Sequence, residues 1–140
     1  MKDEVRVDGE RPEFVPHGDG PPPAAATVSV QNQGDADREA FALVTFVGEI
    51  DLGTAPALGD TVLRGTTEAT AVVLDLSAVT FLDSAGVRLL DNLVHAYEGR
   101  GCVVRLVAPE HGVARFTLTL CAFRSDLVET TVSAARDSLN

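Results

Sequence analysis

The alternation of hydrophobic and polar positions between residues 71 and 107 predicts a strand, a helix and a second strand. Residues 71–76 are rich in valine and apolar up to Asp75, which is typical of a central strand buried on both faces. From Ser84 onward, apolar residues recur every three or four positions, the spacing of a helix that buries one side. These apolar residues are Val87, Leu90, Leu93, Val94 and Tyr97. Residues 102–107 form the second strand, and a right-handed crossover should place the two strands parallel.

Before this unit, the pattern predicts a hairpin and a first helix. Residues 28–30 alternate as a strand does, and residues 41–47 supply a longer buried strand. A turn at residues 34–37 would pair them as a hairpin. Thr54 can cap a helix over residues 54–64, which carries a proline in its first turn.

After this unit, the elements become shorter. Pro109 is expected to open a third helix, whose buried face would consist of Val113, Phe116 and Leu120. Residues 127–128 are expected to form a short edge strand, and residues 131–138 a final helical turn or two. The pattern as a whole predicts a small α/β domain.

Composition narrows the class of protein. At 140 residues with 45% hydrophobic residues, the chain fits one packed domain. A net charge of −10 disfavours nucleic acid and anionic membrane surfaces as partners, since both would repel the chain. No apolar stretch is long enough for a membrane span or a signal sequence, so a cytoplasmic protein is expected. Cys102 and Cys121 have no paired spacing and are expected to be reduced, buried thiols.

The first 26 residues differ from the rest. They hold five of the seven prolines, together with several acidic residues and glycines, and predict a flexible tail. The domain is therefore expected to span residues 27–140.

Ser84 is the main candidate for chemistry. It stands where an apolar strand ends and a helix begins, and an anion there would meet unpaired backbone N–H groups. Ser84 is therefore either a nucleophile or a phosphate acceptor. The hydrolase elbow Gly-x-Ser-x-Gly lacks its first glycine here, because position 82 is leucine. His95 and His111 lack metal-ligand spacing, so neither a metal site nor a cofactor is expected.

Three blocks together resemble the STAS domain, specifically the bacterial anti-sigma factor antagonists. They are Gly48-Glu49-Ile50-Asp51, Val73-Leu74-Asp75-Leu76-Ser77 and Phe81-Leu82-Asp83-Ser84-Ala85-Gly86. The resemblance implies the STAS fold: a mixed four- to five-stranded sheet with a parallel core and about four helices, with one face covered by helices. It also implies a regulatory protein, not an enzyme. Such an antagonist binds an anti-sigma factor that is also a serine kinase, which releases the sigma factor. Phosphorylation of the serine at the position of Ser84 ends this binding, and a PP2C-type phosphatase restores it.

The resemblance places the partner surface at Asp51 and at residues 83–86, that is, Asp83, Ser84, Ala85 and Gly86. Asp83 is interpreted either as a helix cap or as a residue that presents Ser84 to the kinase, and both roles can coexist. Gly86 in the first helical turn indicates close approach of another group, with a partner backbone favoured over core packing.

Two alternatives remain. The chain is either a STAS docking subunit of a larger signalling or transport assembly, or, more remotely, a serine hydrolase. Residues 120–123 also depart from the family, which often has a glycine after the third helix. This departure leaves the local turn unassigned.

Overall fold

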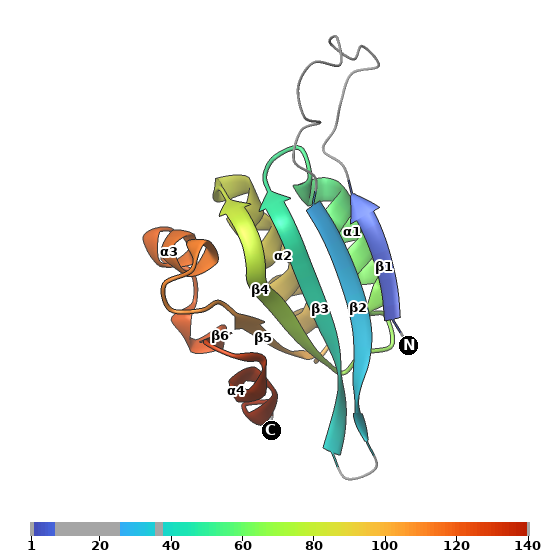
Figure 1. Cartoon of the computed structure of the whole chain (residues 1–140). Helices are drawn as coiled ribbons and strands as arrows, with labels where there is room; N and C mark the ends of the chain where they lie inside the picture. Colours follow the sequence, from blue (N-terminus) through green and yellow to red (C-terminus); the bar gives the residue numbers. More distant parts are fainter. Residues whose placement is uncertain (1, 8–25, 36–37, 140) are drawn as a thin grey trace.

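A computed structural model describes residues 2–7, 26–35 and 38–139, which form one sheet with helices around it (Figure 1). The strands are β1 (Lys2–Val7), β2 (Ala26–Asp35), β3 (Arg38–Ile50), β4 (Ala71–Leu82), β5 (Val103–Val107) and β6 (Val128–Glu129). The helices are α1 (Ala55–Gly65), α2 (Ser84–Gly99), α3 (Val113–Leu120) and α4 (Val132–Asp137), with a 3₁₀ turn η1 (Ser125–Leu127). None of the helices in these ranges is long and apolar enough to cross a membrane.

The sheet is mixed, and its strands follow the order β1-β2-β3-β4-β5-β6. β1, β2 and β3 pair antiparallel, whereas β3 to β6 pair parallel. The predicted hairpin, the crossover through α2 and the α/β class with a parallel core are all confirmed. The sheet has six strands, however, rather than the expected four or five.

The additional strand is β1, which comes from the segment that was expected to be a flexible tail. Residues 2–7 pair antiparallel with residues 26–31 of β2, so the prediction of a tail is wrong for them. Backbone hydrogen bonding to an open sheet edge needs no apolar side chains, so a charged composition does not prevent it. The remaining tail residues, 1 and 8–25, lie outside the described residues.

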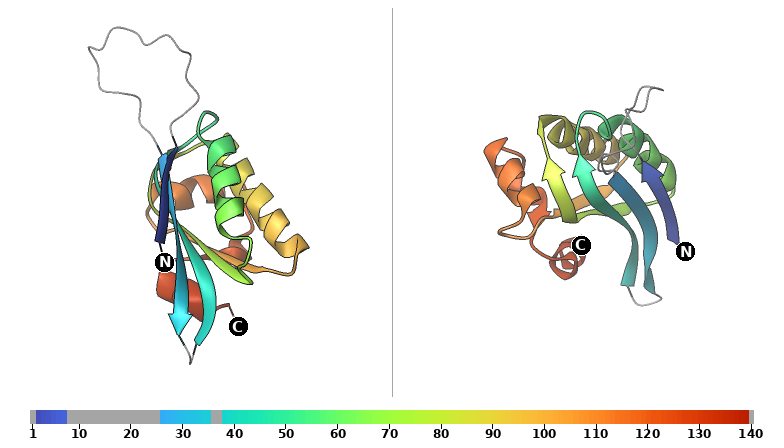
Figure 2. Two further views of the ribbon diagram at one scale, coloured as in Figure 1. Left: turned by 90° about the vertical axis from the view of Figure 1, so that its right-hand side faces the viewer. Right: turned by 45° about the horizontal axis from the view of Figure 1, so that its top comes forward.

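Helices cover the two faces of the sheet unequally (Figure 2). α1 and α2 lie side by side on one face and enclose the larger core with Phe46, Leu74 and Leu106 from the sheet. α4 covers part of the opposite face through a second, smaller cluster that includes Val73 and Ala135. The expectation of one helix-covered face therefore holds for α1 and α2, and α4 adds a partial layer on the other side.

A polar cluster of the buried Thr66 and Tyr97 and the exposed Arg100 joins the C-terminal ends of α1 and α2. The hydroxyls of Thr66 and Tyr97 lie 2.8 Å apart, and burial raises the pKa of the Tyr97 phenol. The Arg100 guanidinium lies 5.3 Å from the centre of the Tyr97 ring and donates hydrogen bonds to the carbonyls of Thr66 and Ala69. The cluster fixes the two helices as a pair.

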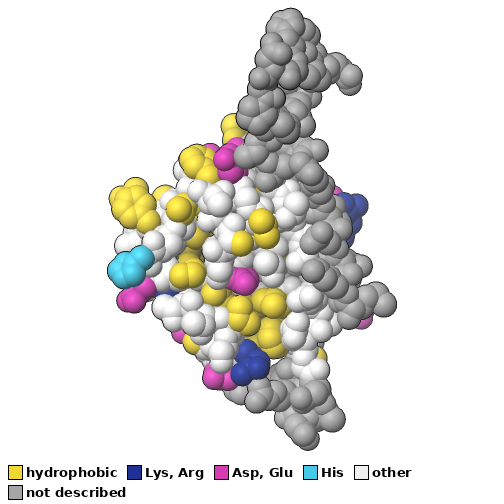
Figure 3. All heavy atoms as spheres, in the orientation of Figure 1, with side chains coloured by type: hydrophobic (Ala, Val, Ile, Leu, Met, Phe, Trp, Pro, Cys, Tyr) yellow, Lys and Arg dark blue, Asp and Glu magenta, His cyan; other side chains and the backbone are white. Residues whose placement is uncertain are grey.

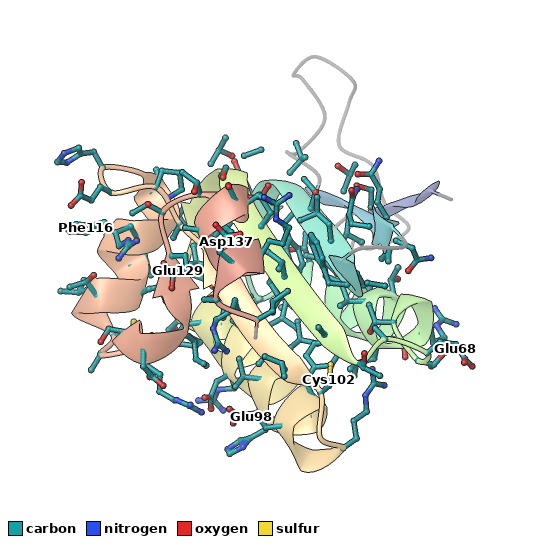
Figure 4. The ribbon with its side chains drawn as sticks, turned by 90° about the horizontal axis from the view of Figure 1, so that it is seen from below. Glu68, Glu98, Cys102, Phe116, Glu129 and Asp137 are labelled. Atoms are coloured by element: carbon teal, nitrogen blue, oxygen red, sulfur yellow. The ribbon has the colours of Figure 1, made fainter. Side chains whose placement is uncertain are left out.

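α3 packs with a different face from the predicted one. Its buried residues are Ala114 and Leu118, whereas Phe116 and Leu120 are 70% and 73% exposed. Hydrophobic side chains are visible at the surface over this helix (Figure 3), and Phe116 projects away from the molecule (Figure 4). The helix packs against β4, which continues beyond the residues that pair with β5. α3 has two apolar sides: Val113, Phe116 and Leu120 lie on one, and Ala114 and Leu118 lie on the other. The spacing alone could not decide which of the two faces inward.

The turn after α3 has the backbone geometry of a helix C-terminal cap, which usually contains glycine, but no glycine is present here. The N–H of Phe123 donates to the carbonyl of Leu118 at 2.9 Å, and that of Ala122 to the carbonyl of Thr119 at 3.1 Å, which is the Schellman pattern. Ala122 has a φ of 57°, in the left-handed region where glycine is usual. The departure from the family at residues 120–123 therefore leaves the turn intact but strains one residue.

The two cysteines differ in environment. Cys102 is buried, as predicted, and burial raises the pKa of its thiol. Cys121 is exposed, so its predicted burial is wrong. It is the C-cap residue of α3, at the start of the turn through residues 121–123.

The packing of α3 predicts opposite outcomes for two truncations. Leu118→Ala should lower the free energy of unfolding by about 2–5 kcal/mol, because it empties a buried site. Phe116→Ala should change it by less than about 0.5 kcal/mol, because its side chain is mostly in solvent. Urea denaturation measures both, and a larger loss for Phe116→Ala would contradict this orientation.

The strain at Ala122 predicts a stabilising substitution. Ala122→Gly should raise the free energy of unfolding by about 0.5–1 kcal/mol, since relief of the left-handed strain outweighs the added flexibility of the unfolded chain. Thermal unfolding measures the gain. Ala135→Gly in the interior of α4 is the control, and it should destabilise the protein.

Candidate functional site

The candidate site lies where two parallel strands end together. Ile50, the last residue of β3, pairs with Leu82, the last residue of β4. The N–H of Asp83 donates to the carbonyl of Ile50 at 3.4 Å, which ties the two strand ends to each other. The chain then enters α1 from β3 and α2 from β4 at the same edge of the sheet (Figure 1).

Asp51 organises the loop between β3 and α1. Its Oδ1 atom accepts hydrogen bonds from the N–H groups of Gly53 at 2.9 Å and Thr54 at 3.0 Å. The buried Thr54 hydroxyl donates to the carbonyl of Glu49 and accepts from the N–H of Asp51, both at 3.0 Å. Thr54 is the predicted cap residue of α1, but its side chain makes no capping bond; Asp51 binds the backbone instead.

Asp83 performs the capping role that was one of its two predicted interpretations. Its Oδ1 atom accepts a hydrogen bond from the N–H of Gly86 at 3.0 Å, and its carbonyl accepts from Val87 at 3.0 Å. α2 therefore begins at Ser84, as predicted, and the side chain of Ser84 is exposed to solvent. Ala85 next to it is half-buried.

Gly86 is buried against the ends of β3 and β4, so the expectation that it admits a partner backbone is wrong. A Cβ atom at this position would lie 2.4 Å from a side-chain carbon of Leu82 and 2.9 Å from the carbonyl oxygen of Ile50. The glycine thus lets α2 start directly on the strand ends. Core packing, the alternative interpretation, accounts for it.

Two grooves flank Ser84. The first lies between the beginnings of α1 and α2, and its lining is mostly apolar, with Leu52, Ala55, Pro56, Ala85 and Leu89. The second lies between α2 and the segment after α3, and its lining includes Val87, Asp91 and residues 121–124. Ser84, Arg88 and Asn92 line both grooves. Their spacing of four residues places them on one ridge of α2.

Sequence reasoning missed several residues of this surface. Arg88 and Asn92 could have been found, because helical spacing from Ser84 already places them on its face. Leu52 is 76% exposed and lines the first groove, but a single apolar residue in a loop gives no pattern. Residues 121–124 reach the second groove only through the packing of α3.

The family model for the STAS domain matches residues 29–135, which is most of the chain. This chain belongs to the STAS domain family. The resemblance seen in the three sequence blocks is therefore confirmed.

Among curated proteins, this chain is similar to the anti-sigma-F factor antagonist RsfB from two strains of Mycobacterium tuberculosis. The two sequences are 42% identical over 69 residues, which are 49% of this chain and 52% of the relative. The alignment thus spans about half the length of the curated relatives.

Solved structures share the fold. An anti-sigma factor antagonist from Mycobacterium paratuberculosis is 26% identical, with a TM-score of 0.62 over 80% of this chain and 93% of the other. The phosphorylated form of the Bacillus cell fate determinant SpoIIAA is 18% identical, with a TM-score of 0.55 over 79% of this chain and 99% of the other. The second likeness shows the fold alone.

The packing of Gly86 predicts a specific sensitivity at this site. Gly86→Ala should lower the free energy of unfolding by about 1–3 kcal/mol, because the added methyl group overlaps Leu82 and the Ile50 backbone. Gly99→Ala at the other end of α2 is the matched control, since a Cβ there meets nothing within 4 Å. It should be neutral or stabilising by up to about 1 kcal/mol. Equal effects in chemical denaturation would show that the contacts of Gly86 are not responsible.

Proposed function

We propose that this STAS domain is an anti-sigma factor antagonist that is switched by phosphorylation of Ser84. It binds an anti-sigma factor that is also a serine kinase and thereby releases a sigma factor. The kinase phosphorylates Ser84 and ends the binding, and a PP2C-type phosphatase restores the active form. The protein itself acts in the cytoplasm as a substrate and binding partner rather than as an enzyme.

The exposed hydroxyl of Ser84 carries the proposal. It stands at the first residue of α2, on a ridge between two grooves, so a kinase can approach it from either side. The backbone at the start of α2 is held by the hydrogen bond from the N–H of Gly86 to Asp83 and by the packing of Gly86. Neither contact involves the serine side chain. Ser84 can therefore be modified without disturbing the bonds that start the helix.

The surface around Ser84 suits a protein partner. The first groove, which Ser84 lines, offers apolar contact area from Leu52, Pro56 and Ala85. The loop of Asp51 borders the same strand ends, and we include Asp51, Asp83, Ser84 and Ala85 in the proposed interface. The core of a protein interface is typically apolar with a polar rim, and this arrangement matches it.

Phosphorylation would act on the interface rather than on the fold. A phosphate adds about 1.5 to 2 negative charges at neutral pH. Placed beside the apolar groove and next to Asp83, it would have to be desolvated in the complex and would repel acidic groups of the partner. The free protein pays no such cost, because Ser84 remains in solvent.

The hydrolase alternative finds no support in the positions of the two histidines. His95 lies eleven residues after Ser84 on α2, about 16 Å away along the helix axis, and is exposed. His111 precedes α3 and lines neither groove. A general base must lie within hydrogen-bond reach of the nucleophile, and neither imidazole does.

The test begins with capture of the partner by the unmodified full-length chain, followed by incubation of the isolated pair with ATP. Mass spectrometry should find one phosphate, on Ser84. Ser84→Ala should bind with unchanged affinity and resist modification. Ser84→Asp should bind at least about tenfold more weakly, equivalent to about 1.4 kcal/mol, as measured by calorimetry.

Ser133→Asp is the matched control, because it adds the same charge at an exposed serine of α4 on the other face of the sheet. It should bind as tightly as wild type. Phosphate on another residue, or full affinity of Ser84→Asp, would refute the switch. Capture of a stable multi-protein assembly without kinase activity would favour the docking-subunit alternative instead.

A further inference from the structure

Arg88 is the basic residue nearest to Ser84 along the ridge of α2. The two residues are separated by one helical turn and line the same two grooves. Residues four apart on a helix have their Cβ atoms about 5–6 Å apart, within reach of a long side chain. The arginine is exposed, so its guanidinium is free to turn toward position 84.

The second arginine beside Ser84 is already engaged. Arg124 lines the second groove, but its guanidinium pairs with Glu98 at 2.9 Å and Asp126 at 3.2 Å. Glu98 is the last residue but one of α2, at the opposite end of the helix from Ser84. These two carboxylates raise the pKa of Arg124 and already occupy its guanidinium. In contrast, Arg88 forms no ion pair or hydrogen bond with any part of the chain that the structure describes.

The acidic groups around Arg88 compete weakly for it. Asp91 lines the second groove with Arg88, and Asp83 lines the first. One carboxylate oxygen of Asp83 is bound to the N–H of Gly86. Each carboxylate carries one charge, whereas a phosphate carries up to two and presents three acceptor oxygens. A phosphate at position 84 would therefore be the strongest anionic partner within reach of Arg88.

We propose that Arg88 binds the phosphate of phosphorylated Ser84 through an i,i+4 pair on the surface of α2. The inference rests on the proposed function, since it assumes modification at Ser84. Arg88 is a positioning residue: its planar guanidinium can donate two parallel hydrogen bonds to one phosphate and fix the direction of the group. It favours the doubly charged form of the phosphate and holds it against the ridge between the grooves.

The test uses full-length protein with phosphoserine incorporated at position 84 during translation, so no kinase is needed. Titration of the phosphate by phosphorus NMR at low salt measures its second pKa. The wild type should have a value about 0.3 unit or more below that of Arg88→Gln, because the arginine favours the dianion. Arg88→Lys should recover part of the difference, and 1 M salt should reduce it.

Arg64→Gln is the matched control, because Arg64 is an exposed arginine on α1 that pairs with Asp60 and lines neither groove. It removes the same charge and should leave the phosphate pKa unchanged. Equal pKa values in wild type and Arg88→Gln, or an equal shift in Arg64→Gln, would overturn the proposal. Failure of the captured kinase to modify Ser84 would refute the proposed function without affecting this titration, so the two failures are distinguishable.

Discussion

The parallel pairing of β3 and β4 up to their last residues is the constraint on which the site depends. Because Ile50 and Leu82 are partners in the sheet, the loops that follow them leave side by side, and α1 and α2 begin next to each other. Gly86 completes this arrangement, since any larger residue would push α2 away from the strand ends. Ser84 is exposed between two grooves as a direct result.

Both aspartates of the site accept hydrogen bonds from nearby backbone N–H groups. Asp51 binds two N–H groups of its loop, and Asp83 binds one in the first turn of α2. Each loop is thus held by its own carboxylate, independently of Ser84. A surface built in this way can gain or lose a phosphate while its shape stays constant, which suits a protein whose proposed switch acts on the partner contact.

The second groove has a different origin. One of its walls, residues 121–124, is placed by a Schellman turn that carries alanine in a left-handed conformation. This strain persists because α3 is anchored on both sides: Leu118 is buried against the sheet, and Arg124 is paired with Glu98 of α2. The wall beside Ser84 is therefore maintained by tertiary contacts rather than by local preference.

Sequence alone determined the features that depend on local chemistry. The start of α2 at Ser84, the parallel crossover and the STAS resemblance all follow from spacing and residue type within a few turns of chain, and a helix cap was one of the two roles predicted for Asp83. Other features were decided only by tertiary structure. The inward face of α3, the burial of Gly86 and the exposure of Cys121 depend on which surface packs against which, and β1 depends on an open edge of β2. Local patterns carry no information about such contacts, because several faces or edges satisfy them equally well until the sheet is assembled.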